Sequence, residues 1–449
     1  MSNKDFVEDF FPKSDIVSFL FITIPCFLIF FLIYKYGVNV ITGDEWAIVP
    51  YIDKFFKGEI SFKDILDFHN QHRIALPRIL MLINSKFFGY NSKYQMFLGY
   101  FFTMLSFGVL YKSIENLLGE KFRVSHIIIP AFLIFSMRQW ENFLYGWQFQ
   151  IPMMVFLFLI SLYSLFKSEG IDIYFAVSII SGIFTAYTFG NGILIWPIGF
   201  LLIAVKKRNK ELYIWSLISI ACLFFYFYGY PFKGEDDIYF KKDFLNFVLY
   251  FIVLVGSPLT TEKYTAFILG LILIFFYYHS LKSYKDYPFF ASLIIFSLLS
   301  SFLIAISRSG FGWQGGIGSR YVSFSLLGPM GVYAIFLHKI YYKKEFNFNF
   351  FILLIFLFCF QIITSFSNYF KYELVFIKNK REEYLVKNYK KFSDFELNPD
   401  FSEIDYLKTI NPELYQKIKI DFEKTGYIKK KYAEVLDKYS LNVFGTKEN

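Results

Sequence analysis

Long apolar stretches separated by short polar turns make up most of the chain. The first stretch, residues 16–36, is charged only near its ends, at Asp15 and Lys35. At a rise of about 1.5 Å per residue, a helix of this length crosses a hydrocarbon core of about 30 Å. We therefore expect an all-α polytopic membrane protein with about eleven transmembrane helices. The expected helices lie near residues 16–36, 94–111, 126–137, 151–166, 171–188, 190–205, 212–230, 264–281, 288–306, 321–338 and 348–367.

Basic residues gather in the turns at one end of these expected helices. Because cytoplasmic loops are enriched in lysine and arginine, that end should face the cytoplasm. Residues 1–367 then form a transmembrane domain whose first loop, residues 37–93, lies outside the inner membrane and contains amphipathic helices. Residues 368–449 are expected to form a small extracytoplasmic helical domain. The basic residues are Lys112, Lys121, Arg123, Lys206, Lys207, Arg208, Lys210, Lys282, Lys285, Lys339, Lys343 and Lys344.

One further apolar segment, residues 244–260, affects this topology. If it crossed the membrane, every later loop would change sides, and the lysines of those loops would face outward. The segment also ends in Gly256-Ser257-Pro258, a sequence that breaks a helix. We therefore expect an interfacial or half-inserted helix on the outer side.

The overall composition agrees with a membrane protein. The 449 residues are 55% hydrophobic and 23% aromatic, more than a soluble fold can bury. The net charge of +9 is spread over short loops and forms no continuous stripe, so we expect no nucleic-acid partner. Cys26, Cys222 and Cys359 all lie in apolar stretches, which excludes a disulfide framework as the basis of the fold.

An acidic pair, Asp44 and Glu45, opens the first long loop. Carboxylates beside a membrane are costly to desolvate and often mark a functional site. A helix is expected to begin near Pro50 and to end at Gly58. The pair could therefore act in catalysis, or it could simply cap a helix.

Polar residues are also concentrated before the second expected helix, in residues 67–78. His72, Arg73 and Arg78 are candidates for hydrogen bonding to a sugar or phosphate, although the arginines could instead anchor the chain at the membrane surface. The spacing of His69 and His72 would also suit a divalent metal on a helix face, so a metal is an alternative. No other cofactor is indicated.

A polar turn follows the third expected helix and contains Arg138, Gln139 and Glu141. Arg138 is a cation on the outer side, against the usual trend, which suggests that an anion holds it there. We count it as a candidate for donor phosphate binding, with Gln139 and Glu141 as candidates for substrate binding. Glu141 could instead pair with Arg138 along one helix. Asn191 is expected to serve only as a turn residue.

The most basic outer turn spans residues 307–321 and contains five glycines between Arg308 and Arg320. Glycines allow backbone N–H groups to approach an anion, and the planar guanidinium of arginine matches phosphate oxygens. Both arginines are candidates for phosphate binding, and Trp313 and Tyr321 for substrate binding. The alternative is a flexible loop with ordinary arginines at its rim.

A first span followed by an acidic pair in a long outer loop and many more spans resembles the C-type glycosyltransferase superfamily. The resemblance implies transfer of a sugar from a polyprenyl-phosphate carrier at the outer face. It implies that Asp44 or Glu45 is a catalytic base or a metal-associated acid. The second acid of that superfamily would here be Glu141 or one of residues 235–237. Further similarity to a bacterial branch of multi-span proteins rests on residues 70–73, 77–78, 256–259, 319–321 and 439–444.

The resemblance implies an inverting displacement in which a carboxylate accepts the proton of the acceptor hydroxyl and the lipid phosphate leaves. The acceptor would be a cell-surface glycan, lipid or protein. Three other functions remain open. The chain could be a transporter or flippase of an anionic lipid-linked substrate, an O-antigen polymerase or ligase, or a structural membrane protein.

Overall fold

The computed structural model describes residues 12–231, 243–343, 348–392, 397 and 429–445, and these residues are almost entirely helical. Helices labelled η are 3₁₀ helices. The first loop and its flanks contain α2 (Asp15–Tyr36), η1 (Gly43–Ile48), α3 (Val49–Lys57), α4 (Phe62–Leu66), β1 (Phe68–His69), β2 (His72–Arg73) and α5 (Ala75–Phe88). Next come α6 (Ser92–Leu118), η2 (Gly119–Lys121), η3 (Val124–Ile127), α7 (Ile128–Ile134), η4 (Met137–Gln139), α8 (Trp140–Leu144), η5 (Gly146–Phe149), α9 (Gln150–Lys167), α10 (Ile173–Ala186), η6 (Gly190–Leu194), α11 (Ile195–Val205) and α12 (Asn209–Phe227).

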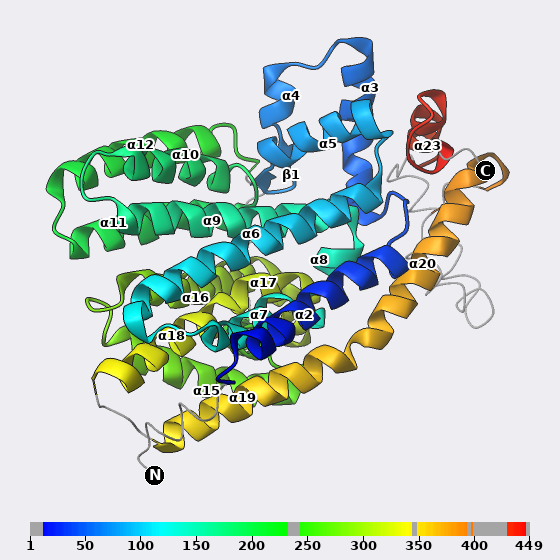
Figure 1. Ribbon diagram of the computed structural model, residues 1–449. Helices are drawn as coiled ribbons and strands as arrows, with labels where there is room; N and C mark the ends of the chain where they lie inside the picture. The colour runs from blue at the N-terminus through cyan, green and yellow to red at the C-terminus, as the bar shows by residue number, and fades with distance from the viewer. Residues whose placement is uncertain (1–11, 232–242, 344–347, 393–396, 398–428, 446–449) are drawn as a thin grey trace.

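The second half of the chain continues the bundle. It contains α14 (Phe244–Gly256), α15 (Lys263–Leu281), α16 (Pro288–Arg308), η8 (Ser309–Phe311), η9 (Trp313–Ile317), η10 (Ser319–Tyr321), α17 (Val322–Ser325) and α18 (Leu327–Tyr342). It ends with α19 (Phe348–Ser367), α20 (Tyr369–Lys387), η11 (Tyr389–Lys391), α23 (Lys429–Lys438) and η13 (Asn442–Phe444). Figure 1 shows α2, α6 and α9 running beside one another, with α3, α4 and β1 beyond one end of them.

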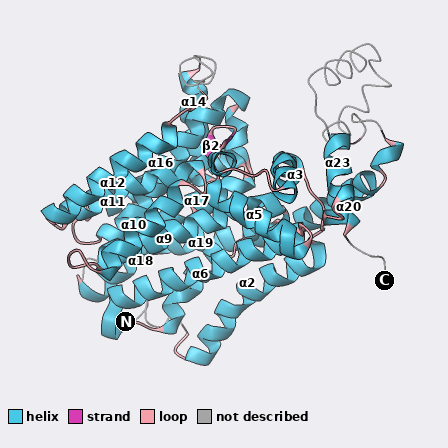
Figure 2. Ribbon diagram, turned by 90° about the horizontal axis from the view of Figure 1, so that it is seen from above, coloured by secondary structure: helices cyan, strands magenta, loops and turns pink. Residues whose placement is uncertain are grey.

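Eight helices in the described residues are long and apolar enough to cross a membrane, which confirms a multi-pass membrane protein. Eleven long spans are not confirmed. The spans expected near 126–137, 171–188 and 190–205 form shorter elements: α7 has 7 residues, α10 has 14 and α11 has 11. A polar or glycine-containing turn lies at an end of each of these helices, and the continuous apolar helix is therefore shorter than a full span. Figure 2 gives a second view of the bundle.

The segment at 244–260 forms α14, whose 13 residues extend about 20 Å, less than the hydrocarbon core. Its length agrees with the expected half-inserted helix. It packs closely and antiparallel on α15, because a Cβ at Gly256 would lie 1.9 Å from the carbonyl oxygen of Ala266 and one at Gly270 would lie 2.1 Å from that of Ile252. Such small residues let membrane helices approach each other.

Several basic turns meet at one end of the bundle. Lys343 forms an ion pair of 2.6 Å with Asp286, and Tyr342 Oη donates a hydrogen bond of 2.6 Å to the carbonyl of Leu118. These contacts bring together the turns after α6, α15 and α18. The basic residues of these turns thus lie at the same end of the bundle.

The first loop folds as predicted around Pro50 and Gly58. Pro50 lies in the first turn of α3, and Gly58 ends the helix with a positive φ of 74°. This left-handed conformation favours glycine because it has no Cβ. Asp67 follows α4, and the chain then forms the short hairpin of β1 and β2.

Part of the C-terminal region packs against the first loop. Asn442 is 1% exposed and accepts a hydrogen bond of 3.1 Å from the backbone N–H of Ile41 through Oδ1. Its Nδ2 donates to Ser92 Oγ and to the carbonyl of Tyr90, at 3.1 and 3.0 Å. The described residues after 367 are helical, and residues 393–396, 398–428 and 446–449 lie outside the described part, so only part of the expected helical domain can be compared.

Candidate functional site

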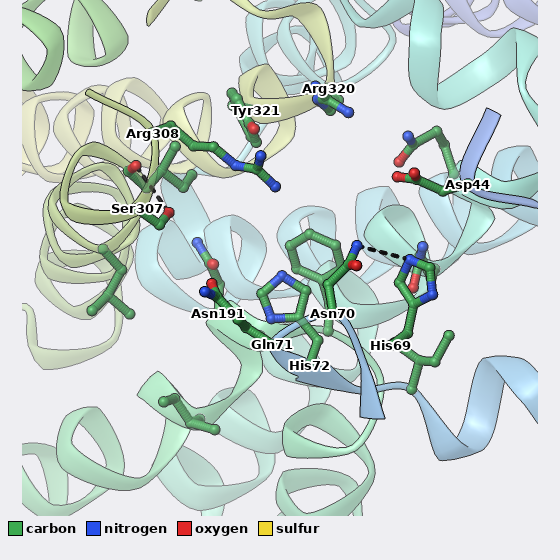
Figure 3. A pocket seen from close by; sticks show the side chains of 18 of the residues that line it. Asp44, His69, Asn70, Gln71, His72, Asn191, Ser307, Arg308, Arg320 and Tyr321 are labelled. Carbon is green, nitrogen blue, oxygen red and sulfur yellow. Dashed lines mark hydrogen bonds between the residues drawn. The ribbon is translucent and has the colours of Figure 1, made fainter. Parts of the chain in front are cut away.

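A cavity of about 290 Å³ lies where several helix ends and turns meet. Its walls come from η1, the hairpin of β1 and β2, the η5–α9 junction, η6, the end of α12, the end of α16 and η10. Figure 3 shows Asp44, Arg308 and Arg320 on one side of this space and Asn70, His72 and Asn191 on the other. Of the predicted site residues, the cavity brings together Asp44, His72, Arg308, Arg320 and Tyr321.

Arg308 and Arg320 give the cavity a basic side. Neither guanidinium forms an ion pair within the described part of the chain; Arg308 lies 5.9 Å from the ring centre of Phe311, and Arg320 lies 5.3 Å from that of Tyr321. Two partly buried cations beside apolar helix ends favour an anionic ligand between them.

The glycine-containing turn that carries Arg320 is fixed by the polar turn after α7. Glu141 Oε2 accepts hydrogen bonds from Ser319 Oγ and, at 2.9 Å, from the backbone N–H of Arg320. Asn142 Nδ2 donates to the carbonyl of Arg320 at 3.1 Å. Gln139 accepts a hydrogen bond from Ser323 Oγ. These residues are not part of the cavity wall, and their contacts position η10.

Arg138 likewise lies outside the cavity wall. It is 2% exposed, and its guanidinium donates to the carbonyls of Thr260, at 3.2 Å, and Ile317. It therefore joins the turn after α14 to the glycine-containing turn. The structure gives no hydrogen bond or salt bridge between Arg138 and Glu141, because Glu141 bonds to η10 instead.

The acidic pair is divided between two environments. Asp44 is exposed to the cavity and forms no hydrogen bond or ion pair with any residue in the described ranges. Glu45 is fully buried; its carboxylate accepts hydrogen bonds from the backbone N–H of Thr42 at 3.3 Å and from Ser92 Oγ at 3.1 Å. The capping interpretation thus describes Glu45, whereas Asp44 remains free to meet a ligand.

Burial raises the pKa of Glu45 from the ordinary value of 4.5 to about 7, and the hydrogen bonds from Thr42 and Ser92 only partly oppose this shift. Because the folded-state pKa is raised, Glu45 stabilises the fold most at low pH, and this contribution falls as pH rises from about 4.5 to about 7. The carboxyl group therefore couples the stability of the first loop to pH.

The Glu45→Gln variant should lose this part of the pH dependence, because its neutral amide can still accept a hydrogen bond through Oε1. We expect the melting temperature of the wild type to fall relative to that of Glu45→Gln between pH 5 and pH 8. Melting curves of both proteins in detergent at these two pH values test this. If the melting temperatures of the wild type and Glu45→Gln differed by the same amount at both pH values, the prediction would be wrong.

The hairpin places His72 in the cavity wall. Asn70, at the turn between the strands, has a positive φ of 52°, and its Nδ2 lies 3.2 Å from His69 Nε2. Desolvation, together with the nearby charges of His69 and Arg308, lowers the pKa of His72 to about 4. His72 is therefore neutral at physiological pH and can both donate and accept a hydrogen bond.

Arg73 and Arg78 are buried and bind backbone carbonyls. Arg73 donates to the carbonyls of Leu66, Tyr226 and Tyr228, the Tyr226 bond being 2.7 Å long. Arg78 Nη1 donates to three carbonyls between residues 64 and 67, at 2.7 to 2.9 Å. Both arginines thus stabilise the loop that carries the hairpin, and neither is part of the cavity wall.

Two further predictions concern a substrate contact by Trp313 and a metal site near His69 and His72. Trp313 packs on Tyr264, with ring centres 5.6 Å apart, and lies outside the cavity wall. For a metal, the described residues contain no group of three His, Cys, Asp or Glu side chains. The hairpin geometry also differs from the helix face on which His69 and His72 were considered as metal ligands.

The cavity also contains amide side chains that were not predicted as site residues, among them Asn191, Gln150 and Gln71. The sequence offered one signal for them, namely polar residues at the very ends of apolar stretches. No known family model matches the sequence, and no curated protein matches it. The cavity wall combines one carboxylate and two guanidinium groups, none with an ion-pair partner among the described residues, and several amides.

Proposed function

We propose that this membrane protein transfers a sugar from a polyprenyl-phosphate-linked donor to an acceptor at the outer face of the inner membrane. The observation that carries the proposal is the placement of Asp44 in the same cavity as Arg308 and Arg320, with no ion-pairing partner for any of the three among the described residues. The positive charges of the two arginines would bind a phosphate, and the negative charge of the carboxylate would act on a nearby hydroxyl.

The reaction that fits these groups is an inverting displacement. The oxygen of an acceptor hydroxyl attacks the anomeric carbon, and its proton passes to the Asp44 carboxylate. The bond between the anomeric carbon and the phosphate oxygen breaks, and its electron pair leaves with the lipid phosphate. Arg308 and Arg320 stabilise the charge that develops on that phosphate, an effect that is strong where water is excluded. General-base catalysis typically contributes ~10²–10⁴ in rate.

The side of the membrane on which the cavity would lie follows from the positions of the basic turns. They gather at the end of the bundle where Tyr342 reaches Leu118, and the positive-inside rule assigns that end to the cytoplasm. The first loop and the cavity would then face outward, where a glycan, lipid or protein acceptor is present.

A transfer assay distinguishes this function from transport. The purified protein is placed in liposomes with a polyprenyl-phosphate sugar labelled in the sugar, together with a preparation of cell-envelope acceptors. We expect labelled acceptor and sugar-free polyprenyl phosphate to appear in equal amounts. Movement of intact donor between leaflets, with no release of polyprenyl phosphate, would contradict the proposal and support a flippase.

A further inference from the structure

Two buried amides in the cavity wall each have one polar atom without a hydrogen-bond partner in the described part of the chain. Asn191 is 5% exposed and Gln150 is 2% exposed, and both line the cavity. Among the described residues, no group accepts a hydrogen bond from Asn191 Nδ2 and none donates one to Gln150 Oε1. Buried amides are normally satisfied, so their unused donor and acceptor point to a polar ligand.

The backbone around Asn191 is packed so that it holds this residue in place. A Cβ at Gly190 would lie 2.4 Å from Nδ1 of His72, and one at Gly192 would lie 1.9 Å from the carbonyl oxygen of Thr185. The contact at Gly192 is with the backbone, so only glycine fits there, whereas a side chain at Gly190 would have to displace the His72 ring. The turn is therefore fixed between the hairpin and α10, and Asn191 is held in the cavity wall, as Figure 3 shows.

The chemistry of the two amides suits a neutral group better than a charged one. Asn191 offers a donor and Gln150 an acceptor, and a hydroxyl can satisfy both kinds of partner. The charged residues Arg308 and Arg320 already supply a site for an anion. The cavity thus has separate groups for an anion and for hydroxyls.

We propose that Asn191 and Gln150 bind hydroxyl groups of the donor's sugar and determine which sugar the protein accepts. This inference rests on the proposed function. It adds a specificity-determining role for two residues that would otherwise be considered parts of a turn and of a helix end. A site that bonds a hydroxyl discriminates strongly against a sugar lacking it, because its buried polar groups then stay unpaired.

Binding of two lipids tests the proposal. The probes are a polyprenyl phosphate and the same lipid carrying a hexose. Asn191→Leu and Gln150→Leu should each weaken binding of the hexose-bearing lipid about 5- to 150-fold, since each change leaves a buried hydroxyl of the sugar without its hydrogen-bond partner. Binding of the sugar-free lipid should not change, which also shows that the variants are folded.

Gln361 provides a matched control. It is also a buried glutamine, 1% exposed and without hydrogen-bond partners for its amide among the described residues, but it lies in α19 outside the cavity wall. Gln361→Leu should leave the affinities for both lipids unchanged. Donors lacking single hydroxyls add a second readout: one deoxygenation that weakens wild-type binding should have no further effect in Asn191→Leu.

The outcomes separate this inference from the proposed function. If the wild type binds both lipids and Asn191→Leu and Gln150→Leu weaken both equally or neither, the amides bind only water and the inference is wrong. If the wild type binds neither lipid, the proposed function fails, and the inference with it.

Discussion

Replacing Asp44 with asparagine should slow sugar transfer by about two to four orders of magnitude while the donor still binds. Asparagine keeps the size of aspartate and most of its hydrogen-bonding capacity, but it cannot accept the acceptor's proton. Because Asp44 forms no bond with another described residue, the change should leave the fold intact. Turnover with a polyprenyl-phosphate sugar, donor affinity and melting temperature are the measurements.

Glu45→Gln is the matched control for this experiment, because it makes the same chemical change one residue away at a buried position. It should retain most of its transfer activity. Near-normal turnover in Asp44→Asn would show that Asp44 is not the base. The transporter and polymerase functions would then be favoured over sugar transfer.

Loss of the two cavity arginines should weaken donor binding strongly. A hydrogen bond to a charged group contributes ~1.5–3 kcal/mol, so Arg308→Ala or Arg320→Ala should each reduce affinity about 10- to 150-fold. Arg320→Lys should lie between the wild type and Arg320→Ala, because lysine keeps the charge but not the planar fork of donors. Binding of a polyprenyl-phosphate analogue measures these effects.

Arg138→Lys serves as the control for the arginine variants. Its guanidinium binds the carbonyls of Thr260 and Ile317, so the change should lower the melting temperature and leave donor affinity nearly unaltered. If all three arginine positions changed affinity equally, or if Arg308→Ala and Arg320→Ala bound the analogue like the wild type, the cavity arginines would not be the phosphate site.

Sequence patterns predicted the membrane helices better than they predicted the role of single polar residues. Apolar length is a local property, and it identified the eight long helices. The different environments of Asp44 and Glu45 depend instead on Ser92, which lies 47 positions after Glu45. The hydroxyl of Ser92 donates a hydrogen bond to the Glu45 carboxylate and holds it inside the protein. A contact at that separation leaves no trace in the local pattern.

The arginines show a second limit of prediction from residue type. Arginine suits phosphates, but it also suits backbone carbonyls where irregular chain lies between helices. Arg73, Arg78 and Arg138 bind carbonyls, whereas Arg308 and Arg320 remain open to the cavity. The sequence around these residues does not separate the two groups, because the carbonyls that they bind belong to other segments.

The hydrogen bond between Asn442 and Ile41 also sets an order of events during synthesis. The two residues are 401 positions apart, which is roughly 20–80 s of translation at about 5–20 residues per second. During that time the membrane helices can insert and the cavity arginines can take their places, while residues 37–42, which lead to Asp44, lack their contact with Asn442. A nascent chain would thus complete the helices that carry Arg308 and Arg320 before residue 442 can reach the first loop, and the hydrogen bonds of Asn442 with Ile41 and Ser92 would form last.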